Sequence, residues 1–110
     1  MVNALVTVYI PTHNRPILLE RALRSVVTQD YHTIEIIVVD DGSRSENRNK
    51  NLQICSQFAN VQLIQLEKSI GASAARNLAI AAATGEYITG LDDDDEFCPG
   101  RISAFIEAWQ

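Results

Sequence analysis

Four apolar, β-prone runs alternate with helical segments along this chain, and that alternation limits its possible folds more than any other feature. The runs are ALVTVYI at 4–10, IEIIVV at 34–39, VQLIQL at 61–66 and EYITGL at 86–91. Each is followed by apolar residues at helical spacing, such as Leu19, Leu23 and Val26 after the first run. Repeated strand–helix–strand units predict an α/β fold: an open, mainly parallel, Rossmann-like sheet of about four strands with flanking helices.

The first strand and helix have recognisable boundary residues. Pro11 is expected to end the strand, because proline cannot donate a ladder hydrogen bond. Pro16 suits the first position of the helix, and Asn14 or a neighbour is expected to cap it. The helical spacing continues to about Gln29.

The later helices are less evenly marked. The polar stretch RSENRNKN at 44–51 is expected to be a loop that leads into a helix, and the Ala-rich segment 71–84 has good helix propensity. Gly85 occupies the place of a helix C-cap. The second helix is expected to bury a stripe made of Leu52, Cys55, Phe58 and Ala59, and the last segment one made of Ile102, Phe105, Ile106 and Trp109.

Composition indicates one small globular domain and excludes some partners. The chain has 110 residues, of which 46% are hydrophobic and 21% are charged. Its net charge of -5 argues against nucleic-acid binding, which normally requires a basic face. Since Asp92 to Glu96 alone contribute five negative charges, the acidity is mostly local.

Cysteine usage and hydropathy favour the cytoplasm. Cys55 and Cys98 lie far apart without metal-ligand spacing, and they are expected to be reduced thiols. The N-terminal residues have the pattern of a strand and lack the basic start and cleavage site of a secretory signal. No apolar run approaches the length of a membrane span.

The run LDDDDEFCP at 91–99 places five carboxylates side by side directly after an apolar strand. Adjacent carboxylates repel one another and raise each other's pKa values unless a cation neutralises them. A solvated acidic loop is the simpler alternative, but hard divalent cations prefer such oxygen ligands. An EF-hand loop is excluded because Phe97 stands where that motif needs glycine. We therefore expect a divalent metal site.

Other polar residues follow the remaining strand ends. In a parallel sheet the carboxyl ends of all strands open onto one edge, where α/β proteins bind ligands. We therefore expect Pro11-Thr12-His13, Asp40-Asp41-Gly42 and Asp92 to Asp95 to meet there. Taken alone, the aspartate pair could be a turn with a helix cap, and His13 could be an ordinary loop residue.

Three segments together resemble a known family. VTVYIPTHNR, IEIIVVDDGS and GASAARNLAIAAATGEYITGLDDDDEFCPGRI are similar, in order and spacing, to the N-terminal half of family 2 glycosyltransferases. The resemblance covers essentially the whole chain. It implies a truncated GT-A fold in which residues 1–110 form a nucleotide-sugar-binding domain, the N-terminal part of a larger inverting transferase.

The resemblance also implies roles for particular residues. The loop with Pro11, Thr12 and His13 would contact the nucleoside base. Asp41, together with Asp40, would accept hydrogen bonds from the base. Arg76 would lie near the base and the phosphates. In the Asp-x-Asp motif, a carboxylate ahead of the metal ligand would face the ribose, which assigns Asp92 and Asp93 to the nucleotide sugar. The metal, Mn²⁺ or Mg²⁺, would be held by Asp94, with Asp95 as the alternative because four consecutive aspartates allow two registers.

The expected partners follow from the same resemblance. They are a nucleoside-diphosphate sugar, first of all a UDP-sugar, and a glycan or lipid-linked acceptor, with the full-length protein cytoplasmic or peripheral at the inner face of the membrane. The catalytic base is expected beyond Gln110, so these residues alone should be a poor catalyst. An exposed sheet edge makes a homodimer an expectation. The alternatives are a non-catalytic nucleotide-binding module and a receiver-like signalling domain, and the latter would need its acidic pair after the first strand.

Overall fold

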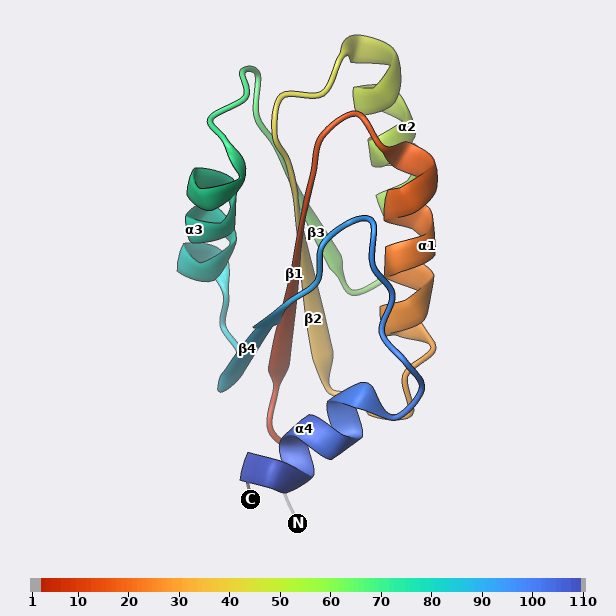
Figure 1. The fold of residues 1–110 in the computed structure, drawn as a ribbon, viewed down its shortest axis with the longest axis vertical. Helices are drawn as coiled ribbons and strands as arrows, with labels where there is room; N and C mark the ends of the chain where they lie inside the picture. The colour runs from red at the N-terminus through yellow and green to blue at the C-terminus, as the bar shows by residue number, and fades with distance from the viewer. Residues whose placement is uncertain (1–2, 110) are drawn as a thin grey trace.

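The computed structural model describes residues 3–109 and contains one four-stranded sheet. Its strands are β1 (Val6–Thr12), β2 (Ile34–Asp40), β3 (Val61–Gln65) and β4 (Tyr87–Gly90). All neighbours pair in parallel, in the order β3-β2-β1-β4 (Figure 1). The α/β fold with a parallel sheet is therefore confirmed.

Helices cover both faces of the sheet. They are α1 (Pro16–Val27), α2 (Ser45–Cys55), α3 (Ala72–Ala82) and α4 (Arg101–Trp109). In Figure 1, α1 and α2 lie on one face and α3 on the other, while α4 crosses the end of the sheet at which β1 begins. Among residues 3–109, no helix combines the length and the hydropathy needed to cross a membrane.

The core has two layers because the central strands are buried on both sides. Val8, Ile36 and Val38 belong to the larger cluster, which α1, α2 and α4 complete. On the other face, Ile37 and Val39 pack with small alanines of α3. Burial of both faces explains why these strands are continuous apolar runs instead of alternating patterns.

Pro11 does not end β1, contrary to the expectation. It pairs in register with Val39, and β1 continues to Thr12. The Tyr9 carbonyl accepts from the N–H of Leu91, beside β4, and the Thr12 carbonyl accepts from the N–H of Asp41, beside β2. The odd-numbered residues of β1 therefore direct their backbone groups toward β4 and the even-numbered ones toward β2. The ring nitrogen of Pro11 thus faces the β4 side, where β4 has already ended at Gly90, and no ladder bond is lost.

The first helix begins as expected, and its N-cap position is taken by the neighbour of Asn14. Pro16 occupies the start of α1, while the N-cap is Arg15, which makes no side-chain cap bond. Asn14 has a positive φ of 56°. Its amide oxygen accepts from the backbone N–H of Arg44 and from Asn47 Nδ2, and so fixes the start of α2.

The second helix is longer at its start and shorter at its end than expected. The polar stretch is itself helical from Ser45, because α2 buries Asn47 and Asn51 beside Ile54 and Cys55. Leu52 is 53% exposed and Ala59 is also exposed, so these two members of the predicted stripe were wrong. Cys55 is buried, and Phe58 lies beyond the helix but packs against the same core cluster. Cys55 and Cys98 are free thiols, as expected, and burial raises the pKa of the Cys55 thiol to about 12.

Gly85 is not the cap of α3. The helix ends at Ala82 with Ala83 as its C-cap. A Cβ at Gly85 would lie 2.6 Å from Thr7 Oγ1 and 2.7 Å from the Thr7 nitrogen. Glycine is needed there because the chain passes close to the start of β1 as it enters β4.

Candidate active site

The loops after β1, β2 and β4 meet at one edge of the sheet and line a cavity of about 310 Å³. This confirms that the strand ends bring distant segments together. Seven of the residues singled out from the sequence line the cavity, together with Arg15 and Ala72: Pro11, Thr12, His13, Asp41, Asp92, Asp93 and Asp94.

The loop after β1 is fixed by hydrogen bonds to the loop after β2. His13 Nδ1 lies 2.6 Å from the carbonyl oxygen of Asp41, so this nitrogen must be the donor. The Asn14 amide oxygen accepts from a backbone N–H, which orients Asn14 Nδ2 as the donor to His13 Nε2 at 3.1 Å. The His13 ring is therefore held in one tautomer at the mouth of the site.

Asp40 is buried inside the protein and does not line the cavity. It is 0% exposed, and its carboxylate accepts from the Ser43 N–H and from Asn51 Nδ2, both at 3.0 Å. Burial alone would raise its pKa, but hydrogen bonds from Ser43, Asn51 and Gln65 outweigh burial and hold the pKa of Asp40 below its ordinary value. Its position makes it a support for the turn that presents Asp41.

Asp41 connects that turn to the start of α3. Its carboxylate accepts from the N–H groups of Ile70 and Gly71 at 2.7 and 3.1 Å, and from Ser69 Oγ at 2.9 Å. Gly42 makes this approach possible, because its φ is 69° and a Cβ there would lie 2.3 Å from the Ser69 nitrogen. Asp41 is thus placed at the cavity wall with its carboxylate already ordered.

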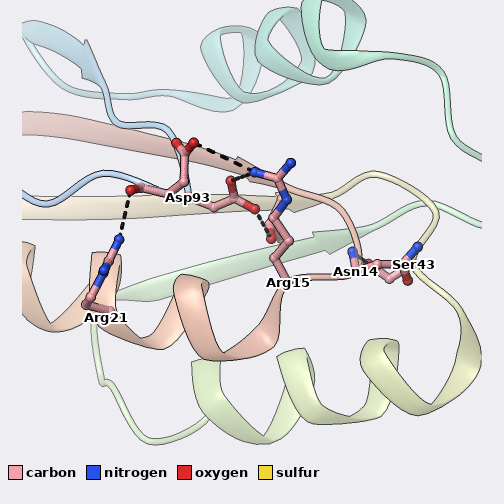
Figure 2. A network of polar contacts seen from close by, with 7 residues as sticks. Asn14, Arg15, Arg21, Ser43 and Asp93 are labelled. Carbon is pink, nitrogen blue, oxygen red and sulfur yellow. Dashed lines mark hydrogen bonds and ion pairs between the residues drawn. The ribbon is translucent and has the colours of Figure 1, made fainter.

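The four aspartates of the acidic run separate into one inward and three outward carboxylates. Asp93 turns inward: it is 7% exposed, Thr12 Oγ1 donates to it at 2.8 Å, and Arg15 Nη1 lies 3.3 Å away (Figure 2). Three exposed residues offer carboxylate oxygens within 4.8 Å of one another: Asp92, Asp94 and Asp95. This donor set suits a hard divalent cation.

Two arginines at the site were not identified from the sequence. Arg15 also lies 3.9 Å from Asp94, while Arg21 donates to the Asp94 carbonyl at 2.8 Å and lies 3.7 Å from Glu96. Arg15 follows the Thr12-His13-Asn14 turn directly, and that position was a usable signal. No sequence signal could have identified Arg21, because the sequence does not show which face of α1 the acidic loop covers.

Arg76 lines a second, larger cavity of about 700 Å³. Asp92 lines both cavities, and Asp95 and Tyr9 share the larger one with Arg76. Arg76 therefore lines the same cavity as Asp92 and Asp95 and does not line the smaller cavity that contains Asp41.

Together, the parallel sheet, the cavity at its carboxyl edge and the carboxylate cluster define an α/β protein with a candidate ligand site where open sheets of this kind bind ligands. The family profile described as Glycosyl transferase family 2 matches residues 7–110. The chain belongs to this family, as its motifs suggested, and this favours the glycosyltransferase interpretation over a receiver-like domain.

Curated relatives agree with this assignment. The chain is 44% identical over 104 residues to WcaA of Escherichia coli (strain K12), whose name assigns it to colanic acid biosynthesis as a glycosyl transferase; the match covers 94% of this chain and 37% of WcaA. The chain is also 38% identical over 103 residues to a β-1,3-glucosyltransferase of Campylobacter jejuni that acts on GalNAc(5)-diNAcBac-PP-undecaprenol. This match covers 92% of the chain and 33% of the Campylobacter protein. The chain thus spans about a third of the length of these relatives.

Solved structures show the same GT-A architecture. TarS 1–349 of S. aureus, in complex with UDP-GlcNAc, superposes with a TM-score of 0.81 at 30% identity, covering 94% of this chain and 31% of that one. The mannosyltransferase PcManGT of Pyrobaculum calidifontis, in complex with GDP-Man and Mn²⁺, gives a TM-score of 0.78 at 29% identity, covering 90% and 30%.

Proposed function

We propose that this chain is the donor-binding, N-terminal part of a larger glycosyltransferase domain that transfers a hexose, with inversion, from a nucleoside-diphosphate sugar to an acceptor hydroxyl. The observation that carries the proposal is the cavity at the sheet edge, which has Asp41 and His13 on one side and the acidic run on the other. A UDP-sugar is the first donor to test and a GDP-sugar the second, because related proteins bind UDP-GlcNAc and GDP-Man. The acceptor is proposed to be a glycan or a lipid-linked sugar, as in the Campylobacter relative.

The proposed roles follow the side chains that reach the cavity. The loop of Pro11, Thr12 and His13, together with Asp41, is assigned to the nucleoside, and Arg76 to the phosphate side. Asp92 is assigned to the ribose, because it lines both cavities. Since Asp40 and Asp93 are buried and bonded within the protein, we assign them to positioning instead of direct ligand contact.

The outward carboxylates are proposed to hold Mn²⁺ or Mg²⁺. Asp94 is the principal ligand in this proposal, and Asp92 and Asp95 lie close enough to share it. A divalent cation bound there would act as a Lewis acid that stabilises negative charge on the departing diphosphate. The base that removes the acceptor proton is assigned to the part of the full-length relatives that lies beyond the matched region.

Ligand-dependent stability tests the proposal. With Mn²⁺ present, UDP or GDP at a hundred times its dissociation constant should raise the free energy of unfolding by roughly 2.7 kcal/mol. Urea unfolding with each nucleoside diphosphate measures this, and the nucleobase alone is the control. No stabilisation by any nucleoside diphosphate would contradict the proposal. Stabilisation by the ligand, without sugar transfer by the full-length protein, would favour a non-catalytic binding module instead.

A further inference from the structure

Arg15 lies between the buried and the exposed members of the acidic run. Among the residues that line the 310 Å³ cavity, all of them described by the structure, it is the only arginine or lysine. Its Nη1 is 3.3 Å from Asp93 Oδ1 and 3.9 Å from Asp94 Oδ2. Figure 2 shows its side chain reaching from the start of α1 to Asp93.

The positive charge of Arg15 is favourable at this position only because acidic side chains lie nearby. It is the N-cap of α1, where the helix dipole is positive, and the first turn of α1 contains no acidic residue. A cation there is unfavourable unless carboxylates from elsewhere compensate it. Asp93 and Asp94, far away in the sequence, supply that compensation.

The two carboxylates hold Arg15 unequally. Asp93 has a side chain only 9% exposed, and Thr12 Oγ1 fixes its second oxygen at 2.8 Å. The side chain of Asp94 is 57% exposed, and its contact with Arg15 is longer. Since water screens exposed pairs more strongly, the contact to Asp94 is the easier one to break.

We propose that Arg15 is the resident counter-cation of Asp93 and Asp94, anchored on Asp93, and that it gives up Asp94 when a divalent cation binds to Asp92, Asp94 and Asp95. The inference rests on the metal site of the proposed function. Arg15 and a divalent cation compensate the same carboxylate charge, so they compete for Asp94. The anchor on Asp93 keeps the guanidinium close to the site during the exchange.

The competition predicts opposite effects for two variants. Arg15→Gln removes the competing charge and should tighten the binding of Mn²⁺ alone by about fivefold, the size expected for unit charges about 4 Å apart in water. Asp93→Asn keeps an acceptor for Thr12 but no longer anchors the guanidinium by charge. Arg15 then turns fully to Asp94, and Mn²⁺ binding should weaken by about threefold to tenfold.

The experiment is a double-mutant cycle on the purified protein, with Mn²⁺ alone as the probe and the free Mn²⁺ electron paramagnetic resonance signal as the readout. Asp93→Asn should weaken Mn²⁺ binding at least threefold more with Arg15 present than in the Arg15→Gln background. Arg24→Gln is the matched control: Arg24 is another exposed arginine of α1, bonded to Glu20 at 2.8 Å, and its replacement should leave Mn²⁺ affinity unchanged. Arg15→Lys keeps the charge and should stay near the wild type.

Each contrary result has a definite meaning. An Arg15→Gln protein whose Mn²⁺ affinity equals that of Arg24→Gln overturns the proposal. An equal effect of Asp93→Asn in both backgrounds also overturns it, because Asp93 would then be a metal ligand itself. If Mn²⁺ binds and Asp94→Asn abolishes binding while Arg15→Gln has no effect, only the counter-cation role fails. If Mn²⁺ binds to neither the wild type nor Arg15→Gln, the metal site and the counter-cation role fail together.

Discussion

Removal of the Asp40 carboxylate should destabilise the fold more than replacement by its amide. Asp40 is 0% exposed and accepts from the Ser43 N–H and Asn51 Nδ2 at 3.0 Å, with Gln65 Nε2 further away at 3.4 Å. Hydrogen bonds to a charged acceptor contribute about 1.5–3 kcal/mol each, and Asp40→Ala leaves both close donors without a partner. The expected loss in the free energy of unfolding is therefore about 3–6 kcal/mol.

Asp40→Asn is the matched variant. Its amide oxygen can still accept from the Ser43 N–H. Asn51 Oδ1 is buried and has no hydrogen-bond partner in the described part of the chain. If the Asn51 amide turns over, this oxygen can accept from the new amide, so Asp40→Asn should cost only about 1–2 kcal/mol.

The pH dependence gives the second half of this test. The net effect of its hydrogen bonds lowers the pKa of folded Asp40 below the ordinary value of 3.8. A lowered pKa contributes stability that is present above the unfolded value and is lost as the pH falls through the folded one. The stability difference between wild type and Asp40→Asn should therefore be constant from about pH 7 to 5 and shrink below about pH 4.

Urea unfolding across this pH range measures both quantities for the wild type, Asp40→Ala and Asp40→Asn. Other carboxylates that titrate in the same range contribute equally to the wild type and to Asp40→Asn, and they cancel in the difference. A loss below about 1 kcal/mol for Asp40→Ala would refute the hydrogen-bond argument. A difference that does not change with pH would refute the lowered pKa.

Four further substitutions test the close contacts of two glycines and the role of Asp41. Gly42→Ala should lower the free energy of unfolding by at least about 2 kcal/mol, because φ at this position is 69° and the new Cβ would lie 2.3 Å from the Ser69 nitrogen. Urea unfolding measures the loss, and a value under about 0.5 kcal/mol would contradict this prediction. Gly85→Ala should cost about 1–3 kcal/mol by the same measurement, since its Cβ would lie 2.6 Å from Thr7 Oγ1, and a neutral result would show that β1 can move away. Asp41→Ala should weaken UDP binding about tenfold or more even without metal, as measured by calorimetry, and an unchanged affinity of this variant would exclude Asp41 from the nucleoside site. Ser69→Ala removes one donor to Asp41 and should have a smaller effect on UDP affinity.

The strands and the edge that carries the site followed from the sequence, while the polar contacts did not. A strand that is buried on both faces can be located from its own apolar residues, without knowing which distant residues pack against it. All four strands were therefore located from the sequence. The second helix was misjudged because Asn47 and Asn51 are buried against polar groups of Asn14 and Asp40. A polar residue that is buried through a distant hydrogen bond looks like a loop residue in a periodicity pattern.

The acidic run shows the same limit at the site. Four consecutive aspartates indicated a candidate cation site, but the directions of their side chains depend on an irregular loop with no period of its own. Asp93 is turned inward by Thr12, which lies 81 positions away, and by Arg15. The inward direction of Asp93 could not be predicted from the sequence, and the assignment of Asp94 over Asp95 as the metal ligand stays a prediction.

The most direct test of the central claim is calorimetric titration of UDP, and then GDP, with and without Mn²⁺, on the wild type and Asp94→Asn. We expect Mn²⁺ to strengthen nucleoside-diphosphate binding in the wild type, and Asp94→Asn to remove this gain while leaving the metal-independent affinity. Asp30→Asn is the control, because Asp30 accepts from Ser103 Oγ away from the cavity. Nucleoside-diphosphate binding that is the same with and without Mn²⁺, and the same in Asp94→Asn, would exclude a metal-assisted donor site at the acidic run.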